Sequence, residues 1–511
     1  MGSLLLELDT GGQVLRYTTA AAVQTVGGQQ YQPGLRVDAV QVHALGQTGC
    51  TVTDPHRDWP ALVLELPTPP RWLGSLYWSD DTGRIQLQTG VAIVGALGSP
   101  SSVLPLSVDS ATVPGARQVP DPATATITAG DWPAGGHGAA SYEQDTSSIG
   151  ATLPRVYGAP GLSAMEAGAS VGGPTGTAYR LEAGTLPAVY VDGWIAVASP
   201  PTAASSVTLY DVSAGQYEDG TYATAQPTLQ IVEDAQGRQV QVCTLAGLPY
   251  TGKPMGAEAG TRYGVSWSTS DPATSRSAAY VVADLLEASG RPVDAARMQL
   301  DGLLYDVSIE SPTDPLAWVL EQTAGLPLFI GRSSLGHYAR LVPIDRATAD
   351  LQLTLGLADS HSGIVPAEPA GIVSQVQVSY APIDGELSRR VWLTATGSEA
   401  GATAHPSCQV AASAGYDGLL AAELPAVCDP ATASRVAALL AIEYATPGPA
   451  VSLTITDPAS LRRLLLLGPA CLVQVASDGT DDGPDLTGYR IAVDAMTVTD
   501  SSLTLAGTVR R

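Results

Sequence analysis

The sequence predicts a mainly β protein of several domains with α+β insertions, in which two barrel-like domains are joined by smaller α/β domains. Its 511 residues exceed the roughly 250–300 residues at which a single hydrophobic core stops growing. The 54 glycines and 38 prolines interrupt stretches rich in Thr, Val and Ala, which is typical of short strands joined by turns. Apolar and polar residues also alternate near both ends of the chain, as they do in half-buried strands.

An N-terminal barrel-like β domain is expected over residues 1–110. In "LLLELDTGGQVLRYTT" two alternating stretches flank Asp9–Gly12, which predicts a hairpin. A second hairpin is predicted where Trp72–Trp78 and Ile85–Val91 flank Asp81-Thr82-Gly83. Alternation with frequent turns favours a small barrel or a sandwich.

The middle of the chain is expected to hold four further segments. Residues 111–150 lack a clear pattern and are rich in Gly and Pro, which predicts a linker or long loop. Residues 151–270 return to strands and predict a β-rich domain, and residues 271–345 predict an α+β domain. Residues 346–428 predict a β-rich segment, because "IVSQVQVSYAP" alternates and places three apolar side chains on one face: Val376, Val378 and Tyr380.

Two helices and a hairpin define the predicted α+β domain. The first helix is expected over Arg276–Ser289, with an apolar face made of Tyr280, Val281, Leu285 and Leu286. The second helix begins at Pro315, behind the N-cap residue Asp314, and ends at Gly325. The stretch "LPLFIGRSSLGHYARLVPI" that follows predicts the hairpin.

Residues 429–511 predict a C-terminal helix followed by a second barrel-like domain. Asp429 and Pro430 repeat the N-cap arrangement, and one helix face collects Val436, Leu439 and Leu440. Three strands are then expected in "LLLLGPACLVQV", "YRIAVDAMTV" and "SLTLAGTV".

Charge and composition exclude several classes of function. The 25 basic and 49 acidic residues give a net charge of −24, which predicts repulsion from nucleic acids and anionic membranes. Lys253 is the sole lysine, so no P-loop, Ser–Lys dyad or Schiff-base site is expected. The longest apolar run, Leu464–Val473, is too short to span a bilayer. The first residues include Glu7 and Asp9 and no basic stretch, so we expect cytoplasmic synthesis without a signal peptide.

The cysteines and histidines are scattered rather than clustered. The five cysteines are odd in number and form no C-x-x-C pair, which predicts buried thiols instead of disulfides or a zinc ribbon; they are Cys50, Cys243, Cys408, Cys428 and Cys471. A cluster assembled from distant cysteines stays an alternative. No two of the six histidines have the spacing of metal ligands. Because Val40 and Val42 alternate with Gln41 and His43, the imidazole of His43 is predicted to face solvent.

The triplet Asp-Thr-Gly occurs at Asp9 and again at Asp81, which raises the question of an aspartic protease. In such an enzyme two triplet loops face each other, so that two carboxylates share a proton. Here Gly12 and Arg84 follow the triplets, where a small hydroxylated residue is usual, and 72 positions are too few for two full lobes. Asp, Thr and Gly are also ordinary turn residues, so hairpin turns are predicted at both places.

Two further motifs are weak. The pattern Gly-x-Ser-x-Gly around Ser170 needs a strand before it and a helix after it, but "GPTG" at 173–176 cannot begin a helix, so a loop is predicted. In "DGTDDGPDLTGY", Asp478, Asp482 and Gly483 fit an EF-hand loop, but Tyr489 stands in place of the bidentate glutamate. An acidic hairpin is predicted there, with incidental calcium binding as the alternative.

No residue is therefore predicted to be catalytic, cofactor-binding or metal-binding, and the protein is not expected to be an enzyme. A carboxylate pair for glycoside hydrolysis needs only proximity in space, which the sequence leaves open.

Several segments, in this order, resemble the hub proteins at the tail tip or baseplate of tailed bacteriophages, of the siphophage type. The first are "LPRVYGAPG" at 153–161 and "YRLEAGTLPAVYVDG" at 179–193. The helical stretch "SAAYVVADLLEASGRPVDAARMQL", the following helix and hairpin, and "IVSQVQVSYAP" are similar to later parts of that family. The N-terminal "LLLELDTGGQVLRYTT" also looks like the start of gene-transfer-agent tail proteins.

This resemblance implies a structural virion protein, synthesised in the cytoplasm of a bacterial host and located at the tail tip or baseplate. Family hubs are homotrimers with two barrel-like domains per chain, so the ring adapts a sixfold tail tube to a threefold tip and forms part of the genome conduit. The implied partners are the distal tail protein, the tape measure protein, and tip or fibre proteins. The alternatives are a distal tail ring protein and a tail-associated peptidoglycan hydrolase. No cofactor, tight nucleic-acid binding or membrane-spanning segment is expected.

Overall fold

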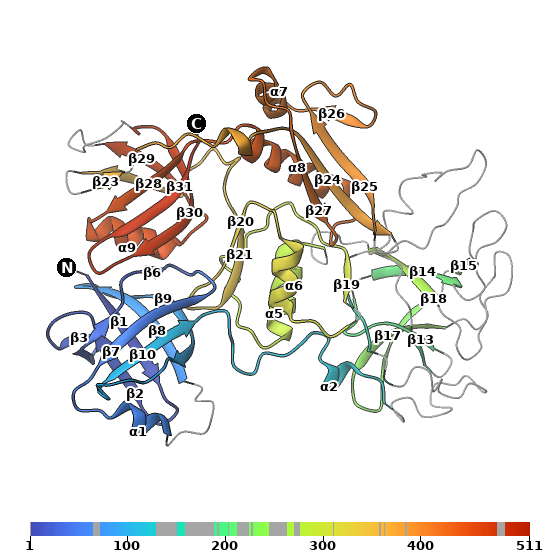
Figure 1. The fold of residues 1–511 in the computed structure, drawn as a ribbon. Helices are drawn as coiled ribbons and strands as arrows, with labels where there is room; N and C mark the ends of the chain where they lie inside the picture. Colours follow the sequence, from blue (N-terminus) through green and yellow to red (C-terminus); the bar gives the residue numbers. More distant parts are fainter. Residues whose placement is uncertain are drawn as a thin grey trace.

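The computed structural model describes residues 2–64, 72–128, 150, 152–158, 189–191, 194–202, 204–211, 224–225, 228–244, 263–269, 276–309, 311–356, 359–361, 363–383, 386–477 and 486–510. Figure 1 shows the N-terminal sheet beside the C-terminal sheet, with the helices α5 (Ala278–Ala288) and α6 (Pro315–Gln322) next to them. Two sheets, of four and three strands, lie on the side of these helices away from the two large sheets, and another four-stranded sheet lies above the helices in this view.

The N-terminal sheet contains nine strands in the order β3-β4-β2-β1-β8-β9-β10-β7-β5. Their bounds are β1 Ser3–Asp9, β2 Val14–Thr18, β3 Gln24–Val26, β4 Gln29–Pro33, β5 Leu35–Arg36, β7 Gln47–Thr53, β8 Trp72–Asp80, β9 Gly83–Val94 and β10 Val103–Asp109. Leu4, Leu6 and Leu8 alternate inward along β1, as predicted. The short helix α1 (Trp59–Leu64) stands where no helix was expected, and it buries Trp59.

The C-terminal sheet has the order β22-β29-β30-β31-β28-β23. Its strands are β22 Leu351–Leu355, β23 Ser360–His361, β28 Ala450–Ile455, β29 Leu472–Ser477, β30 Arg490–Val498 and β31 Leu503–Arg510. The prediction that "LLLLGPACLVQV" is one strand is wrong for its first half, because Leu464–Leu467 complete the helix α9 (Pro458–Leu467). A short apolar run fits a buried helix as well as a strand.

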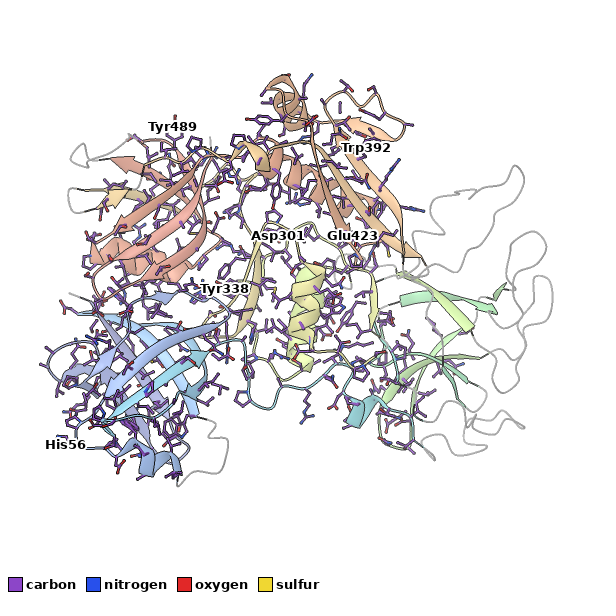
Figure 2. All side chains as sticks on the ribbon, viewed as in Figure 1. His56, Asp301, Tyr338, Trp392, Glu423 and Tyr489 are labelled. Carbon is purple, nitrogen blue, oxygen red and sulfur yellow. The ribbon has the colours of Figure 1, made fainter. Side chains whose placement is uncertain are left out.

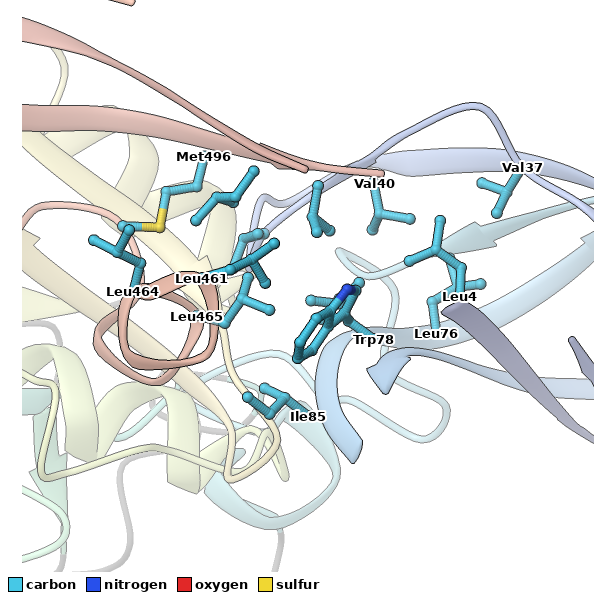
Figure 3. Packing of buried hydrophobic residues seen from close by; sticks show 14 of the residues in the cluster. Leu4, Val37, Val40, Leu76, Trp78, Ile85, Leu461, Leu464, Leu465 and Met496 are labelled. Carbon is cyan, nitrogen blue, oxygen red and sulfur yellow. The ribbon is translucent and has the colours of Figure 1, made fainter. Parts of the chain in front are cut away.

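The two large sheets share one hydrophobic core (Figure 3). Trp78, Val40 and Leu76 come from the N-terminal part, and Leu464 and Met496 come from the C-terminal part. The short strand β6 (Val40–Gln41) leaves the N-terminal region and pairs with β30. Residues near opposite ends of the chain are therefore buried against each other.

The central region follows the prediction closely. Asp314 accepts hydrogen bonds from the backbone N–H groups of Leu316 and Ala317 and so caps α6. The predicted hairpin is formed by β20 (Leu328–Arg332) and β21 (His337–Leu341). In α5 the buried positions are Ala278, Val281, Val282, Leu285 and Leu286. Tyr280 was expected on this face but is 50% exposed, because the buried stripe is centred one position further along the helix.

A second core lies between the central helices and a four-stranded sheet with the order β26-β25-β24-β27. The strands are β24 Val373–Ile383, β25 Glu386–Thr394, β26 Ala402–Ala404 and β27 Gly418–Leu424. The helices α7 (Pro406–Ser413) and α8 (Pro430–Ala445) cover one face, where Val376, Val378 and Tyr380 are buried as predicted. The predicted helix face of Val436, Leu439 and Leu440 is also buried in α8. The 3-10 turn η2 (Pro369–Gly371) precedes β24.

Two further sheets, of four and three strands, lie in the described part of the chain. One has the order β12-β13-β17-β16 and the other β15-β14-β18; the strands are β12 Val189–Val191, β13 Trp194–Ala198, β14 Ala204–Asp211, β15 Thr224–Ala225, β16 Leu229–Glu233, β17 Gln239–Thr244 and β18 Tyr263–Thr269. A third pairing joins β11 (Arg155–Tyr157) to β19 (Val307–Ile309).

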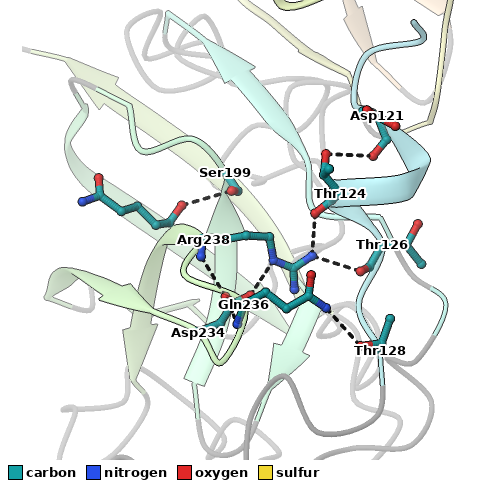
Figure 4. Close-up of polar contacts among 9 residues, drawn as sticks. Asp121, Thr124, Thr126, Thr128, Ser199, Asp234, Gln236 and Arg238 are labelled. Carbon is teal, nitrogen blue, oxygen red and sulfur yellow. Dashed lines mark hydrogen bonds and ion pairs between the residues drawn. The ribbon is translucent and has the colours of Figure 1, made fainter.

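Arg238 attaches the turn between β16 and β17 to the segment around α2 (Pro122–Ala125), as Figure 4 shows. Its Nη1 donates to the carbonyl oxygens of Thr124, at 2.8 Å, and Thr126, at 3.0 Å. Its Nε bonds to Asp234 in the same turn, so the guanidinium is held from both sides.

The predicted class, mainly β with several sheets and helices between them, is confirmed. Among the described strands neither large sheet closes on itself, because β3 and β5 end one and β22 and β23 end the other. The boundaries proposed for the individual domains stay predictions. No helix in the described ranges is long and apolar enough to cross a membrane.

Candidate functional site

Both Asp-Thr-Gly triplets lie at hairpin turns, as predicted. Asp9 ends β1, and its carboxylate accepts the backbone N–H of Gly11 at 2.8 Å. At the second triplet Asp80 ends β8 and accepts both the N–H and the hydroxyl of Thr82. Such bonds to residues two positions ahead are what short polar side chains make in turns.

Strand register keeps the two triplets apart. β1 and β8 are antiparallel, and Asp9 pairs with Leu73 while Asp80 lies seven residues further along β8. At about 3.4 Å per residue this separation is about 24 Å along the strand. The carboxylates of Asp9 and Asp81 therefore do not form the pair that an aspartic protease needs.

The remaining motifs give no site within the part of the chain that the structure describes. Ser170 and the acidic loop from Asp478 to Gly483 lie outside the described residues, whereas Tyr489 is described and half-buried. Four of the five cysteines are buried free thiols, as predicted, and the side chain of Cys243 is not described. No group of three His, Cys, Asp or Glu side chains among the described residues could hold a metal ion.

His43 is the residue whose predicted environment is wrong. The imidazole is 3% exposed, although alternation along its strand placed it on the polar side. The strand β6 ends at Gln41, and His43 itself has φ 57°. This left-handed conformation turns the side chain away from the strand pattern and into the interior.

We call the region around His43 the sheet junction, formed by residues 42–44, Arg297, Tyr338 and Gly468. The backbone N–H of His43 donates to Leu87 of the N-terminal sheet at 3.0 Å, and its carbonyl oxygen accepts the N–H of Arg332 at 2.8 Å. Its neighbour Val42 donates to Met496 of the C-terminal sheet at 2.9 Å. Two consecutive residues thus connect both large sheets and the central hairpin through three backbone hydrogen bonds.

The ring of His43 is neutral in this position. Nδ1 shares a hydrogen bond of 3.0 Å with the hydroxyl of Tyr338, and the two rings meet edge to face. Burial lowers the pKa of His43 to about 3, and the nearby charge of Arg297 acts in the same direction. A proton on this ring would be unfavourable until the medium is strongly acidic.

Arg297 joins the central region to the end of α9. Its guanidinium donates to the carbonyl oxygens of Leu466 and Leu467, which α9 itself leaves without partners. The same group lies 5.8 Å from the ring centre of Tyr338 and bonds to Asp294 at 3.1 Å. Figure 2 shows Tyr338 where the central hairpin meets both large sheets.

Polar contacts at the rim hold the two sheets in a fixed orientation. Arg462 of α9 forms an ion pair with Asp80 at 3.0 Å. Asp500, between β30 and β31, accepts the N–H of Leu4 at 3.1 Å and the hydroxyl of Thr19 at 2.6 Å. The shared core and these contacts join the two sheets into one body.

Glu7 is the centre of a second polar cluster, on the opposite face of the N-terminal sheet from the shared core. It accepts hydrogen bonds from Arg16, Arg84 and Tyr31 at 2.6–2.9 Å, and from Tyr77 at 3.1 Å. Burial alone would raise the pKa of Glu7, but the bonds from Arg84, Tyr31 and Arg16 hold it below its usual value. Every charge here is paired, so the cluster stabilises β1 and contains no free acid or base.

No protein-family model matches the sequence, and no curated protein matches it. Among solved structures, a chain from the virion of a native gene transfer agent (GTA) particle is 13% identical, with a TM-score of 0.39, and the match covers 73% of this chain and 88% of that chain. The 43 kDa tail protein of prophage MuSo2 from Shewanella oneidensis is 10% identical, with a TM-score of 0.34, and 100% of this chain and 97% of that chain are covered. Prophage tail protein gp18 from Listeria monocytogenes EGD-e is 9% identical, with a TM-score of 0.23, and the coverage is 59% and 94%.

These matches are with virion and tail proteins, the class that the sequence segments resemble. Each TM-score is below 0.5.

Proposed function

We propose that this protein is a structural component of the tail of a phage-like particle, and that it forms the central hub of the tail tip or baseplate as a homotrimeric ring. The observation that carries the proposal is the shared core of the two large sheets. Each chain then presents two strand-rich units as one rigid body. Three chains present six such units, which fits a ring that adapts a sixfold tube to a threefold tip.

A ring of this kind depends on rigid subunits and not on catalytic groups. The sheet junction supplies stiffness, because His43, Arg297 and Tyr338 connect the two sheets to the central hairpin through short hydrogen bonds and ring contacts. A closed ring of identical chains uses a heterologous interface, in which two different surfaces of each chain meet. The partners in the virion would be the distal tail protein, the tape measure protein, and tip or fibre proteins.

The charge of the chain suits a conduit for a genome. Each phosphate neutralised by Lys or Arg adds affinity for DNA and so would hold the passing strand. With 49 acidic and 25 basic residues, average repulsion from the phosphate backbone is expected. A titration with duplex DNA at moderate salt should show no saturable binding, and tight salt-sensitive binding would contradict the conduit.

The stoichiometry decides between the hub and its closest alternative. Native mass measurement of the purified protein, or of an isolated tip complex, should give three copies. Six copies would favour a distal tail ring protein instead. Zymography on bacterial cell walls tests the other alternative, since a clear lytic band would indicate a peptidoglycan hydrolase.

A further inference from the structure

A cavity of about 550 Å³ lies where the helix α8 meets the C-terminal sheet. Its lining includes residues 446–449, which follow α8, together with Val509 and Arg510 of β31. Tyr489, which precedes β30, also lines it, and Figure 2 shows this residue at the upper end of the C-terminal sheet. The volume falls within the roughly 300–1,000 Å³ that is usual for small-molecule sites.

Apolar side chains that belong to neither hydrophobic core line this cavity. They are Ile344, Ile364 and Ile442, none of which is a member of the first or the second core. Leu486 and Val509 of the first core also line the cavity, and Ile442 lies on α8, whose buried residues belong to the second core. The cavity therefore lies between the two cores, and small-molecule sites are common at such boundaries between packed units.

The residues that line the cavity offer one free hydroxyl and a charge that is already paired. Arg510 Nη2 donates to the carboxylate of Glu443 on α8, so the charge of the guanidinium is balanced. The hydroxyl of Thr446 donates to the carbonyl oxygen of Ile442 at 3.2 Å. Tyr489 is half-buried, and within the described ranges its hydroxyl forms no hydrogen bond. A hydroxyl or carbonyl group of a ligand would satisfy this phenol.

This combination favours an uncharged aliphatic ligand. An ionised group brought into the cavity would lose its hydration without gaining an opposite charge, because Arg510 is already paired with Glu443. The apolar lining consists of branched aliphatic side chains and prolines, and Tyr489 is the one aromatic residue of the lining. An aliphatic chain would remove the isoleucines from water, of which Ile364 is 38% exposed.

We propose that this cavity binds a small, uncharged aliphatic molecule, and that a single hydroxyl or carbonyl group of the ligand bonds to Tyr489. The ligand lies between α8 and the C-terminal sheet and covers isoleucine side chains that neither core covers. The site is complete within one chain. It goes beyond the proposed function and does not depend on how many copies the particle contains.

A fluorescence titration with N-phenyl-1-naphthylamine, an uncharged apolar dye, tests for the site. The full chain should bind the dye saturably, and linear alcohols should displace it. 1-Octanol should compete about fifteenfold more strongly than 1-hexanol, because each buried CH₂ group contributes about fourfold. Octanoate and octylammonium should compete at least about tenfold more weakly than 1-octanol, since each carries a charge into the cavity. Dye binding that does not saturate, or equal competition by 1-octanol and octanoate, would overturn the proposal.

Two variants locate the site. Ile364→Trp and Ile442→Trp each place a larger side chain in the lining, so each should weaken 1-octanol binding at least about tenfold. Val365→Trp is the matched control, because Val365 is the next residue, is 58% exposed and does not line the cavity. This control should bind as the wild type does, and circular dichroism checks that each variant is folded. Undiminished binding in both isoleucine variants would mean that the alcohol binds elsewhere, and the proposal would be wrong.

Tyr489→Phe tests the polar contact. It removes the hydroxyl and keeps the ring, so 1-octanol should bind about fivefold more weakly. The ratio between 1-octanol and 1-hexanol should stay the same, because the aliphatic contacts are unchanged. An unchanged affinity for 1-octanol would overturn the role assigned to Tyr489.

The same measurements distinguish other occupants of the cavity and separate this inference from the proposed function. If the chain self-associates, and 1-octanol only reverses that association without binding to the separated chain, a second copy fills the cavity and the inference is wrong. Analytical ultracentrifugation with and without 1-octanol makes this distinction. A chain that binds 1-octanol but never assembles into three copies would contradict the hub and leave the ligand site standing.

Discussion

His43 is a neutral, buried histidine in a backbone conformation that residues with a Cβ seldom adopt, with φ 57°. The conformation is maintained because three groups over-determine it: Leu87 accepts its N–H, Arg332 donates to its carbonyl oxygen, and Tyr338 bonds to its ring. Among the described residues, the polar groups beside the imidazole are the phenol of Tyr338 and the guanidinium of Arg297. At this site a residue type often used in catalysis performs a structural task.

Stability should depend on pH through His43. Its pKa is about 3 in the folded protein and about 6.5 in an unfolded chain. The unfolded state therefore binds the proton first as the pH falls, and stability is lost below about pH 6.5, by up to about 1.4 kcal/mol per pH unit. The variant His43→Asn keeps a residue that tolerates positive φ and removes this contribution. Between pH 6.5 and pH 5 the wild type should lose about 2 kcal/mol more than the variant.

Urea unfolding at a series of pH values measures this difference. His337 is also buried, with a pKa lowered to about 4, and it acts in the same direction in both proteins. The comparison between wild type and variant thus isolates His43. Parallel stability curves for the two proteins would show that the ring of His43 is accessible to protons in the folded state.

At the scale of elements, the end of α9 determines how the C-terminal sheet meets the rest of the chain. Gly468 follows the helix with φ 72°, and its N–H donates to Leu464 at 2.9 Å. Glycine is suited to this C-cap position because it has no Cβ. The close approach matters as much as φ, since a Cβ here would lie 2.9 Å from Arg297 Nη1 and 2.9 Å from His43 Nδ1.

The variant Gly468→Ala should destabilise the protein more than Gly11→Ala does. Gly11 has φ 84° and open space around the position of a Cβ, so its substitution carries only the backbone cost of about 1 kcal/mol. At Gly468 the new methyl group also displaces Arg297 from the carbonyl oxygen of Leu467. Loss of a hydrogen bond to a charged group adds about 1.5–3 kcal/mol. Chemical denaturation of both variants provides the comparison, and equal losses would show that the junction adapts to the methyl group.

Local signals predicted most elements, and their failures have a physical cause. The N-cap pattern Asp-Pro correctly placed α6 and α8. The same pattern at Asp457 and Pro458 begins α9, but the apolar run that follows also fits a buried strand, and this ambiguity concealed the helix. β6 has only two residues and pairs with β30, more than 450 positions away. No pattern in the neighbouring sequence indicates a contact with so distant a strand. The buried environment of His43, which follows β6, could therefore not be predicted.

At the scale of the whole molecule, the two ends of the chain form one core and the middle forms another. The first contains Leu4, Trp78, Leu464 and Met496, and the second contains the central helices together with β24, β25 and α8. Sequence periodicity identified most of the buried faces, but it could not show which faces meet. A barrel-like domain was predicted at each end of the chain, and the structure packs the two terminal regions against each other through side chains of both.

This shared core predicts that the backbone amides of the two large sheets lose their protection against hydrogen exchange together. Met496 lies in β30, is almost completely buried and packs in the core that also holds Trp78 of β8. Met496→Ala should cost about 2–5 kcal/mol, because it removes buried methylene groups and leaves a cavity. If the sheets open as one cooperative unit, native-state hydrogen exchange should accelerate by similar factors in β8 and β9 and in β28, β30 and β31.

Leu393→Ala, in the second core, is the matched control and should accelerate exchange in β24, β25 and β27 first. Faster exchange confined to the C-terminal sheet in Met496→Ala would mean that the two sheets unfold independently, and the rigid body on which the hub proposal depends would be lost.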